Sequence, residues 1–212
     1  MTLQISGTNM QSVNSQERLR QSIDNHLDVV QQLSGQLQII ESIAAEMADS
    51  LQAGGTIFWC GNGGSAADCQ HMAAEFVGRF RRERPGLASV ALTTDTSAIT
   101  AIANDYGFDQ IFRRQVEALC ARGDVVVGIS TSGNSENVSL ALIEAKHRGA
   151  FTVSFTGAHG GKLLALSDRS LRIASIETAR IQEAHILAGH LLCDLVETAH
   201  CSRAARPEGD IQ

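Results

Sequence analysis

The chain has 212 residues, of which 43% are hydrophobic and 19% charged, a balance typical of one globular domain with a substantial core. Its formal net charge of −6 argues against a nucleic-acid surface, although a local site can still hold an anion, and no apolar run reaches the roughly 18 residues of a membrane span. Five cysteines without a C-x-x-C pair indicate reduced thiols, as in a cytoplasmic protein.

The N-terminal part predicts a tail and two helices. Residues 1–15 are rich in Ser, Asn and Gln and predict a loose segment. Apolar residues then recur at helical spacing over 23–33 and again over 37–51. The two predicted helices part near Ser34-Gly35 and end at Gly54-Gly55. We expect this pair to cover the sheet or to join a subunit interface.

From residue 56 onward, short apolar strands alternate with helices. Strands are predicted at 56–60, 87–92, 124–130, 151–156 and 169–173, and helices at 66–80, 96–103, 109–121, 135–148, 160–166 and 178–201. This alternation predicts an α/β fold with a parallel sheet and helices on both faces. In such sheets, ligands bind beyond the carboxyl ends of the strands.

The first predicted strand runs into a glycine-rich turn and then a helix. Gly61, Gly63 and Gly64 lack a Cβ, so the backbone can turn sharply and approach a ligand. Ser65 is a suitable N-cap, and the free N–H groups of the helix start form an anion site. Further along this helix, His71 and Glu75 are four residues apart and share a face.

Two nucleotide-binding interpretations of this turn are weaker. Residues 61–66 fit the G-x-G-x-x-A dinucleotide fingerprint, which also needs an acidic residue about 20 positions on, at the end of the next strand. Residues 79–83 occupy that region and precede the next strand instead. The P-loop pattern is excluded because no Gly-Lys-Ser/Thr follows.

A second polar loop follows the third predicted strand. Residues 130–135 read Ser-Thr-Ser-Gly-Asn-Ser, and a helix follows. Alone, this loop is a polar turn with an N-cap. Parallel strands place it at the same sheet edge as the glycine-rich turn, however, and two such loops suit a small phosphorylated ligand. Residues 94–96 and Asn104-Asp105 lie near the same edge or at helix ends.

The last predicted helix carries polar residues among apolar ones, namely Gln182, His185, His190 and His200. A lone helical histidine is more often structural than functional. Gln182 and His190 are about 80° apart around the helix and about 12 Å apart along it. They can contact one small ligand by reaching toward each other or through a break in the helix near Gln182. Alternatively, an adjacent subunit supplies one of them.

Taken together, these motifs resemble those of a known family. Residues 61–65 and 130–135 resemble the paired loops of the SIS (sugar isomerase) domain, and the other motifs resemble the phosphoheptose isomerases within that family. The matching residues are Ser65-Ala66-Ala67-Asp68 with His71, Glu75 and Arg79, then Arg84-Pro85-Gly86, residues 104–108, and residues 180–183 with His190. The likeness runs from about residue 16 to residue 201.

The resemblance implies a fold, an assembly and a metal. The fold is a three-layer αβα sandwich around a five-stranded parallel sheet, Rossmann-like and preceded by N-terminal helices. A single SIS domain over 16–202 is expected, with tails at 1–15 and 203–212. The assembly is a homotetramer with sites at subunit junctions. One zinc ion per subunit is held by His71, Glu75, Gln182 and His190.

The resemblance also implies an activity. It is the aldose–ketose isomerisation of D-sedoheptulose 7-phosphate to D-glycero-D-manno-heptose 7-phosphate through an enediol, the first step of nucleotide-activated heptose biosynthesis. Glu75 and His190 would move protons between C1 and C2, which fits the base and acid that an enediol requires. The phosphate would lie on Ser130, Thr131, Ser132 and Ser135. The remaining substrate contacts would come from Asn62, Gly63, Gly64, Ser65, Glu75, Asn104, Asp105 and Gln182.

One departure and two alternatives accompany this hypothesis. Some relatives carry Asp directly before Arg-Ile-Gln, where this chain has Ala179. One alternative is a non-catalytic SIS protein that binds a phosphosugar or a replication initiator; such relatives lack the acid/base pair that Glu75 and His190 supply here. The other is an isomerase for arabinose 5-phosphate. Many of those carry an extra pair of regulatory modules, for which this chain has no room.

Overall fold

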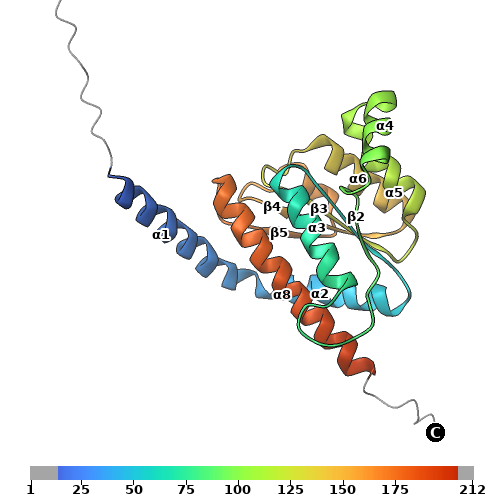
Figure 1. Cartoon of the computed structure of the whole chain (residues 1–212), viewed down its shortest axis with the longest axis horizontal. Coiled ribbons are helices and arrows are strands. Elements are labelled where there is room, and N and C mark those ends of the chain that lie inside the picture. The colour runs from blue at the N-terminus through green and yellow to red at the C-terminus, as the bar shows by residue number, and fades with distance from the viewer. Residues whose placement is uncertain (1–13, 205–212) are drawn as a thin grey trace, which may run out of the picture.

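A computed structural model describes residues 14–204 and shows a five-stranded sheet in which all strands are parallel (Figure 1). The strand order is β2-β1-β3-β4-β5. The strands are β1 (Ile57–Gly61), β2 (Ser89–Ala91), β3 (Val125–Ser130), β4 (Phe151–Thr156) and β5 (Arg169–Arg172). In the central strand β3 all six residues are buried, as expected for a strand covered on both faces.

Helices cover both faces of this sheet. They are α1 (Ser15–Leu33), α2 (Leu37–Gln52), α3 (Gly64–Val77), α4 (Thr96–Tyr106), α5 (Arg113–Leu119), α6 (Glu136–Arg148), α7 (Leu163–Leu166) and α8 (Thr178–Ala204), with short 3-10 turns η1 (Ser34–Gln36) and η2 (Phe108–Gln110). Successive β1 residues alternate between two cores: Trp59 packs with α2, α3 and α8, whereas Phe58 packs with α5 and α6. The predicted αβα sandwich is therefore confirmed.

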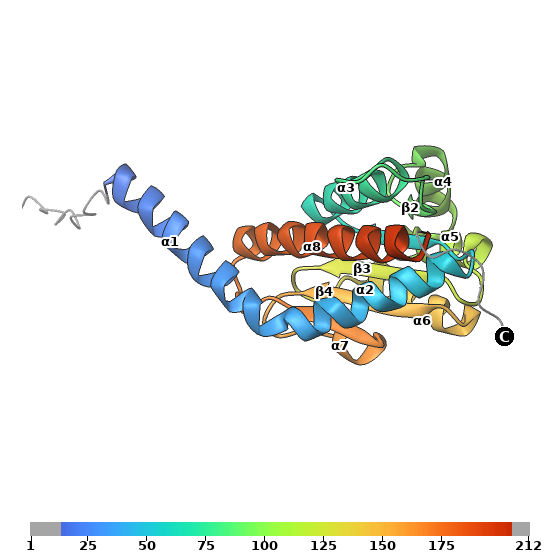
Figure 2. The same cartoon turned by 90° about the horizontal axis from the view of Figure 1, so that it is seen from below.

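Two features of the helical layers bear on the site. Figure 2 shows α3, α8 and α2 side by side, with α8 in the middle. In both overall views, the N-terminal part of α1 extends away from the rest of the molecule. Within residues 14–204, no helix combines the length and the apolar character that crossing a bilayer requires.

The predicted elements are all present, with shifted ends. The helix expected at 109–121 is divided into η2 and α5. The helix expected at 160–166 begins only at Leu163, because Gly160 and Gly161 have φ values of 73° and 55°, outside the helical region. The expected tails, 1–15 and 203–212, lie mostly outside the described residues; Ser15 begins α1, and α8 continues to Ala204.

Candidate functional site

The glycine-rich turn opens α3 at the carboxyl edge of the sheet. Helix α3 begins at Gly64, and its N-cap is Gly63, with φ of 56° and no side-chain hydrogen bond. The prediction that Ser65 caps the helix was wrong. Ser65 lies inside the first turn and is 3% exposed, so its hydroxyl is not placed as a cap. Gly63 and Gly64 themselves are exposed.

The turn is joined to the second loop through an amide pair. Asn62 Nδ2 donates to Asn137 Oδ1 at 2.9 Å, and Asn137 Nδ2 donates to Asn62 Oδ1 at 2.8 Å. Asn137 lies in the first turn of α6 and is 2% exposed, whereas Asn62 is half-buried, so this contact is partly shielded from water. The two loops therefore meet at one edge of the sheet, as the parallel strands predicted. Asn137 was missed, because nothing in its local sequence separates it from a surface residue.

Residues 130–135, here called the hydroxyl loop, bring three serines together. The Ser130 hydroxyl lies 2.9 Å from that of Ser135 and 3.4 Å from that of Ser132. Ser135 is the N-cap of α6, but its side chain makes no capping hydrogen bond. Hydroxyl groups beside free helix N–H groups form a site suited to a phosphate. Thr131 is half-buried in the same loop.

The segment between β4 and α7 is hydrogen-bonded to the backbone of the hydroxyl loop. The Gly157 N–H donates to the Thr131 carbonyl at 3.0 Å, and the Leu163 N–H donates to the Gly133 carbonyl at 3.0 Å. Gly133 has φ of 69°, and its Cα lies so close to the Gly160 carbonyl that no side chain fits there. The path of the hydroxyl loop is therefore fixed by backbone contacts.

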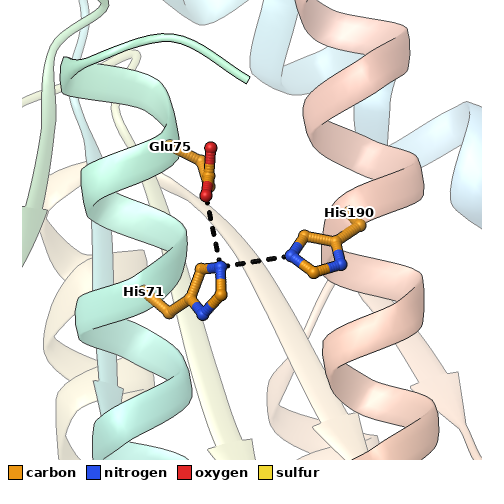
Figure 3. Close-up of side chains that lie close together, drawn as sticks. All are labelled: His71, Glu75 and His190. Carbon is orange, nitrogen blue, oxygen red and sulfur yellow. Dashed lines mark hydrogen bonds and ion pairs between the residues drawn. The ribbon is translucent and has the colours of Figure 1, made fainter. Parts of the chain in front are cut away.

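A second cluster forms where α3 and α8 lie side by side. His71 Nε2 is 3.2 Å from Glu75 Oε1 and 3.2 Å from His190 Nε2 (Figure 3). One ligand atom from each of the three residues lies within 4.8 Å of the others. Burial lowers the pKa of His190, and His71 and Arg81 lower it further, although Glu75 opposes them. Two imidazoles and a carboxylate in this arrangement match the donors of zinc sites, which bind neutral histidine.

Gln182, the fourth predicted metal ligand, lies elsewhere in the single chain. Its amide packs against Gly64, where a Cβ would come within 2.5 Å of its Nε2. His71 lies seven residues after Gly64, which is about 10 Å along α3. The structure thus brings together His71, Glu75 and His190 and leaves Gln182 beside the glycine-rich turn.

Two further predicted substrate contacts lie on α4. Asn104 and Asp105 are exposed near the end of α4, where the Asn104 amide donates to Asp105 at 2.8 Å. Within the described part of the chain, neither residue bonds to the hydroxyl loop or to His71. Helix α4 packs chiefly on η2 and carries no fully buried residue.

His185 is a core residue, as expected of most helical histidines. It is 1% exposed, and its Nε2 lies 3.2 Å from the Thr156 carbonyl, so this nitrogen carries the proton. Burial lowers the pKa of His185 to about 4, although the hydrogen bond to Thr156 acts in the opposite direction. The ring is therefore neutral at physiological pH and belongs to the packing of α8 on β4.

The chain is similar in sequence and in fold to known proteins. The SIS domain model matches residues 21–157. The phosphoheptose isomerase of Aquifex aeolicus is 54% identical over 167 residues, covering 79% of this chain and 87% of that protein. The solved phosphoheptose isomerase of Neisseria gonorrhoeae is 46% identical with a TM-score of 0.83, covering 87% of this chain and 100% of the other. That of Francisella tularensis is 35% identical with a TM-score of 0.85, covering 88% and 100%.

Proposed function

The chain belongs to the phosphoheptose isomerase family of SIS domain proteins, and we propose that it converts D-sedoheptulose 7-phosphate to D-glycero-D-manno-heptose 7-phosphate. The observation that carries this proposal is the cluster of His71, Glu75 and His190 on paired helices, in a fold whose hydroxyl loop suits a phosphate. We also propose that this reaction is the first step of nucleotide-activated heptose biosynthesis.

Glu75 and His190 are the proposed acid/base pair. In an enediol mechanism, a base removes the proton from one of the two reacting carbons, and an acid protonates the carbonyl oxygen. The Glu75 carboxylate is suited to the carbon-bound proton. His190 lies on the facing helix within the same cluster, where its imidazole is placed to pass a proton to or from the oxygen.

The proposed substrate contacts extend along the turn and the hydroxyl loop. The phosphate is assigned to Ser130, Thr131, Ser132 and Ser135, whose hydroxyl groups cluster at the start of α6. The sugar is assigned to Asn62, Gly63, Gly64, Ser65, Asn104, Asp105 and Gln182, with Glu75 at the reacting carbons. Because Asn62 is paired with Asn137, its side chain is already ordered before the substrate binds.

Ser132→Ala tests the phosphate assignment. Ser132 is exposed, and its hydroxyl accepts a hydrogen bond from the Asn134 N–H at 3.2 Å. Because this contact is exposed to water, the loss of the hydroxyl should not unfold the loop. One hydrogen bond to a charged oxygen is worth about 1.5–3 kcal/mol, so KM should rise by about 10- to 100-fold. Steady-state kinetics should show this rise, whereas Thr198→Ala, an exposed hydroxyl on α8, should match the parent. Unchanged kinetics in a variant with Ser130, Ser132 and Ser135 all replaced by Ala would place the phosphate elsewhere.

We propose zinc, one ion per subunit, as the cofactor of the cluster that His71, Glu75 and His190 form between the two helices, here called the α3–α8 cluster. His71, Glu75 and His190 supply suitable donors, and Gln182 from a neighbouring subunit is proposed as the fourth. When bound, the ion would supply Lewis-acid polarisation of the sugar carbonyl. Gln182 is assigned to a neighbour because, in its own chain, its amide packs at the start of α3.

A homotetramer with sites at subunit junctions is the proposed assembly. Leu19, Ile23 and Leu27 recur every fourth residue on α1 and are 65%, 59% and 57% exposed, which suits burial against another copy. In one chain the Gln182 amide lies beside Gly64, and the exposed Asn104 and Asp105 bond to each other, which supports a site completed by a neighbour.

Mass and metal content test this assembly together. The purified protein should run at about four chains in light scattering, which corresponds to four times 22.6 kDa, and should retain about one zinc per chain by elemental analysis. Chelation should remove most of the activity, and zinc should restore it. A monomer that is fully active after chelation would exclude both the shared site and the metal.

The remaining assignments concern location and domain organisation. We propose that the protein works in the cytoplasm, because its five cysteines are unpaired and four of them are buried, as in a reducing compartment. We also propose that residues 16–202 form a single SIS domain, since the two hydrophobic cores share one sheet.

A further inference from the structure

Residues 78–86, here called the α3–β2 loop, fold around one buried carboxylate on α8. Glu197 is 1% exposed and accepts hydrogen bonds from three successive backbone N–H groups, those of Phe80 at 3.1 Å and of Arg81 and Arg82 at 2.9 Å each. Burial alone raises the pKa of Glu197, but these donors and Arg84 outweigh it and lower the pKa. An ionised carboxylate on α8 therefore sets the path of this loop.

Arg84 connects the same carboxylate to the end of α3. Its side chain is 3% exposed, and its Nε lies 3.2 Å from Glu197 Oε1. Its guanidinium donates to the carbonyls of Glu75 and Phe76, each at 2.9 Å, and to that of Gly78 at 3.2 Å. The carbonyls of Glu75 and Phe76 are in the last turn of α3, and Gly78 is its C-cap. Carbonyls at this end of a helix lack partners within the helix and favour a cation. Arg84 thus binds the backbone of Glu75 itself.

The loop also places an aromatic ring on His190. The Phe80 and His190 rings are stacked, with centroids 5.4 Å apart and an interplanar angle of 21°. Arg81 lies 5.0 Å from the centroid of the Phe80 ring. Because the Phe80 N–H is bonded to Glu197, the carboxylate that anchors Arg84 also fixes the residue that packs on His190.

We propose that Arg84, Glu197 and Phe80 are positioning residues that set the distance and orientation between Glu75 on α3 and His190 on α8. This inference rests on the proposed function, in which those two residues transfer the protons. The ion pair holds the last turn of α3 through its carbonyls, and Phe80 limits rotation of the His190 ring. A displacement of about 1 Å between an acid and a base can reduce turnover by about 10²-fold without weakening substrate binding.

A purely structural role predicts a different pattern. A buried ion pair adds little stability relative to apolar residues of similar size, although the loss of one partner is costly. The chain offers a comparison in Glu144, 9% exposed on α6, which lies 3.5 Å from Arg113 and 3.3 Å from Arg148 on the opposite face of the sheet. Breaking that cluster should destabilise the protein without moving Glu75 or His190.

Phe80→Leu is the first variant to test, since it keeps an apolar side chain and all three backbone hydrogen bonds to Glu197. We expect kcat to fall by about tenfold, with KM unchanged because the hydroxyl loop is untouched. The zinc dissociation constant, measured on the folded protein by competition with a chromophoric chelator, should rise by a similar factor. Phe80→Tyr restores a stacking ring and should recover both values.

Glu197→Gln and Glu144→Gln form a matched pair. Both replace a buried carboxylate by an amide, but only Glu197→Gln releases the α3–β2 loop. We expect kcat to fall by about 10²-fold in Glu197→Gln and to stay within twofold in Glu144→Gln, at a temperature where both are folded. Asp194→Asn breaks the exposed Arg82–Asp194 pair at 3.0 Å in the same loop and should leave kcat unchanged.

Parental kcat and zinc affinity in Phe80→Leu would overturn the proposal, as would equal losses of kcat in Glu197→Gln and Glu144→Gln. If Glu197→Gln does not fold, Phe80→Leu decides alone. Parental protein that binds zinc without isomerase activity would defeat the proposed function, and the zinc affinities of Phe80→Leu and Phe80→Tyr would then decide the positioning role. If the parental protein neither binds zinc nor has isomerase activity, both the proposed function and the positioning role are wrong.

Discussion

Glu75→Gln should reduce turnover of sedoheptulose 7-phosphate by at least about 10²-fold, the usual contribution of a general base. Glu75 lies eleven residues after the first residue of α3, about 16 Å from the helix start. It therefore cannot contact a phosphate there, but it can meet the reacting end of an extended seven-carbon sugar. The amide keeps the size of the side chain and an oxygen that can bind a metal, so the main loss is the base.

The controls for Glu75→Gln follow from its surroundings. The side chain is 24% exposed and contacts His71, so the change should alter stability little, and the thermal transition should stay close to the parent. Glu83→Gln removes the same charge from a side chain that is 88% exposed and should keep full activity. If Glu75→Gln turns over substrate at the parental rate, the catalytic assignment is wrong.

Gly133→Ala should damage both the stability and the substrate affinity. Gly133 has φ of 69°, a region that costs an L-residue about 1–2 kcal/mol, and an added Cβ would collide with the Gly160 carbonyl. The backbone of one loop must then move. We expect the free energy of unfolding to fall by about 2–4 kcal/mol in total, which corresponds to a decrease of about 5–15 °C in Tm. KM should rise as well, because the hydroxyl loop is displaced.

Gly149→Ala separates the collision from the backbone strain. Gly149 has φ of 80° at the end of α6, but an added Cβ would meet only the Arg122 side chain, at 3.4 Å. Gly149→Ala should lower the free energy of unfolding by about 1 kcal/mol, from backbone strain alone, and should leave KM unchanged. Thermal melts at one protein concentration check both variants. Equal losses of Tm in the two would show that the Gly133–Gly160 contact is unimportant.

The fold was predictable because its strands are buried on both faces. Continuous apolar runs such as 125–129, separated by polar helical segments, leave few alternatives to a parallel sheet between helical layers. The ends of elements were less predictable. The helix starts at Gly64 and Leu163 depend on glycine backbone angles, which the sequence pattern does not specify.

The candidate site was predictable to the extent that its residues are local in sequence. His71 and Glu75 share one helix face, and 130–135 form one loop. The pairing of Asn62 with Asn137 and the packing of Phe80 on His190 depend on how distant elements meet. The position of Gln182 beside Gly64 depends on the offset between α3 and α8, which helical periodicity alone does not define.

The most direct test of the central claim is the reaction itself, carried out in deuterated water. Purified protein incubated with sedoheptulose 7-phosphate should form an aldose heptose 7-phosphate that carries deuterium at C2, detected by NMR and mass spectrometry. The label is expected because an enediol forms only after a proton leaves carbon and reaches a side chain that exchanges with solvent. Efficient internal transfer lowers the amount of label but not the yield of aldose. Failure to form any aldose, by protein that is folded and loaded with zinc, would contradict the account.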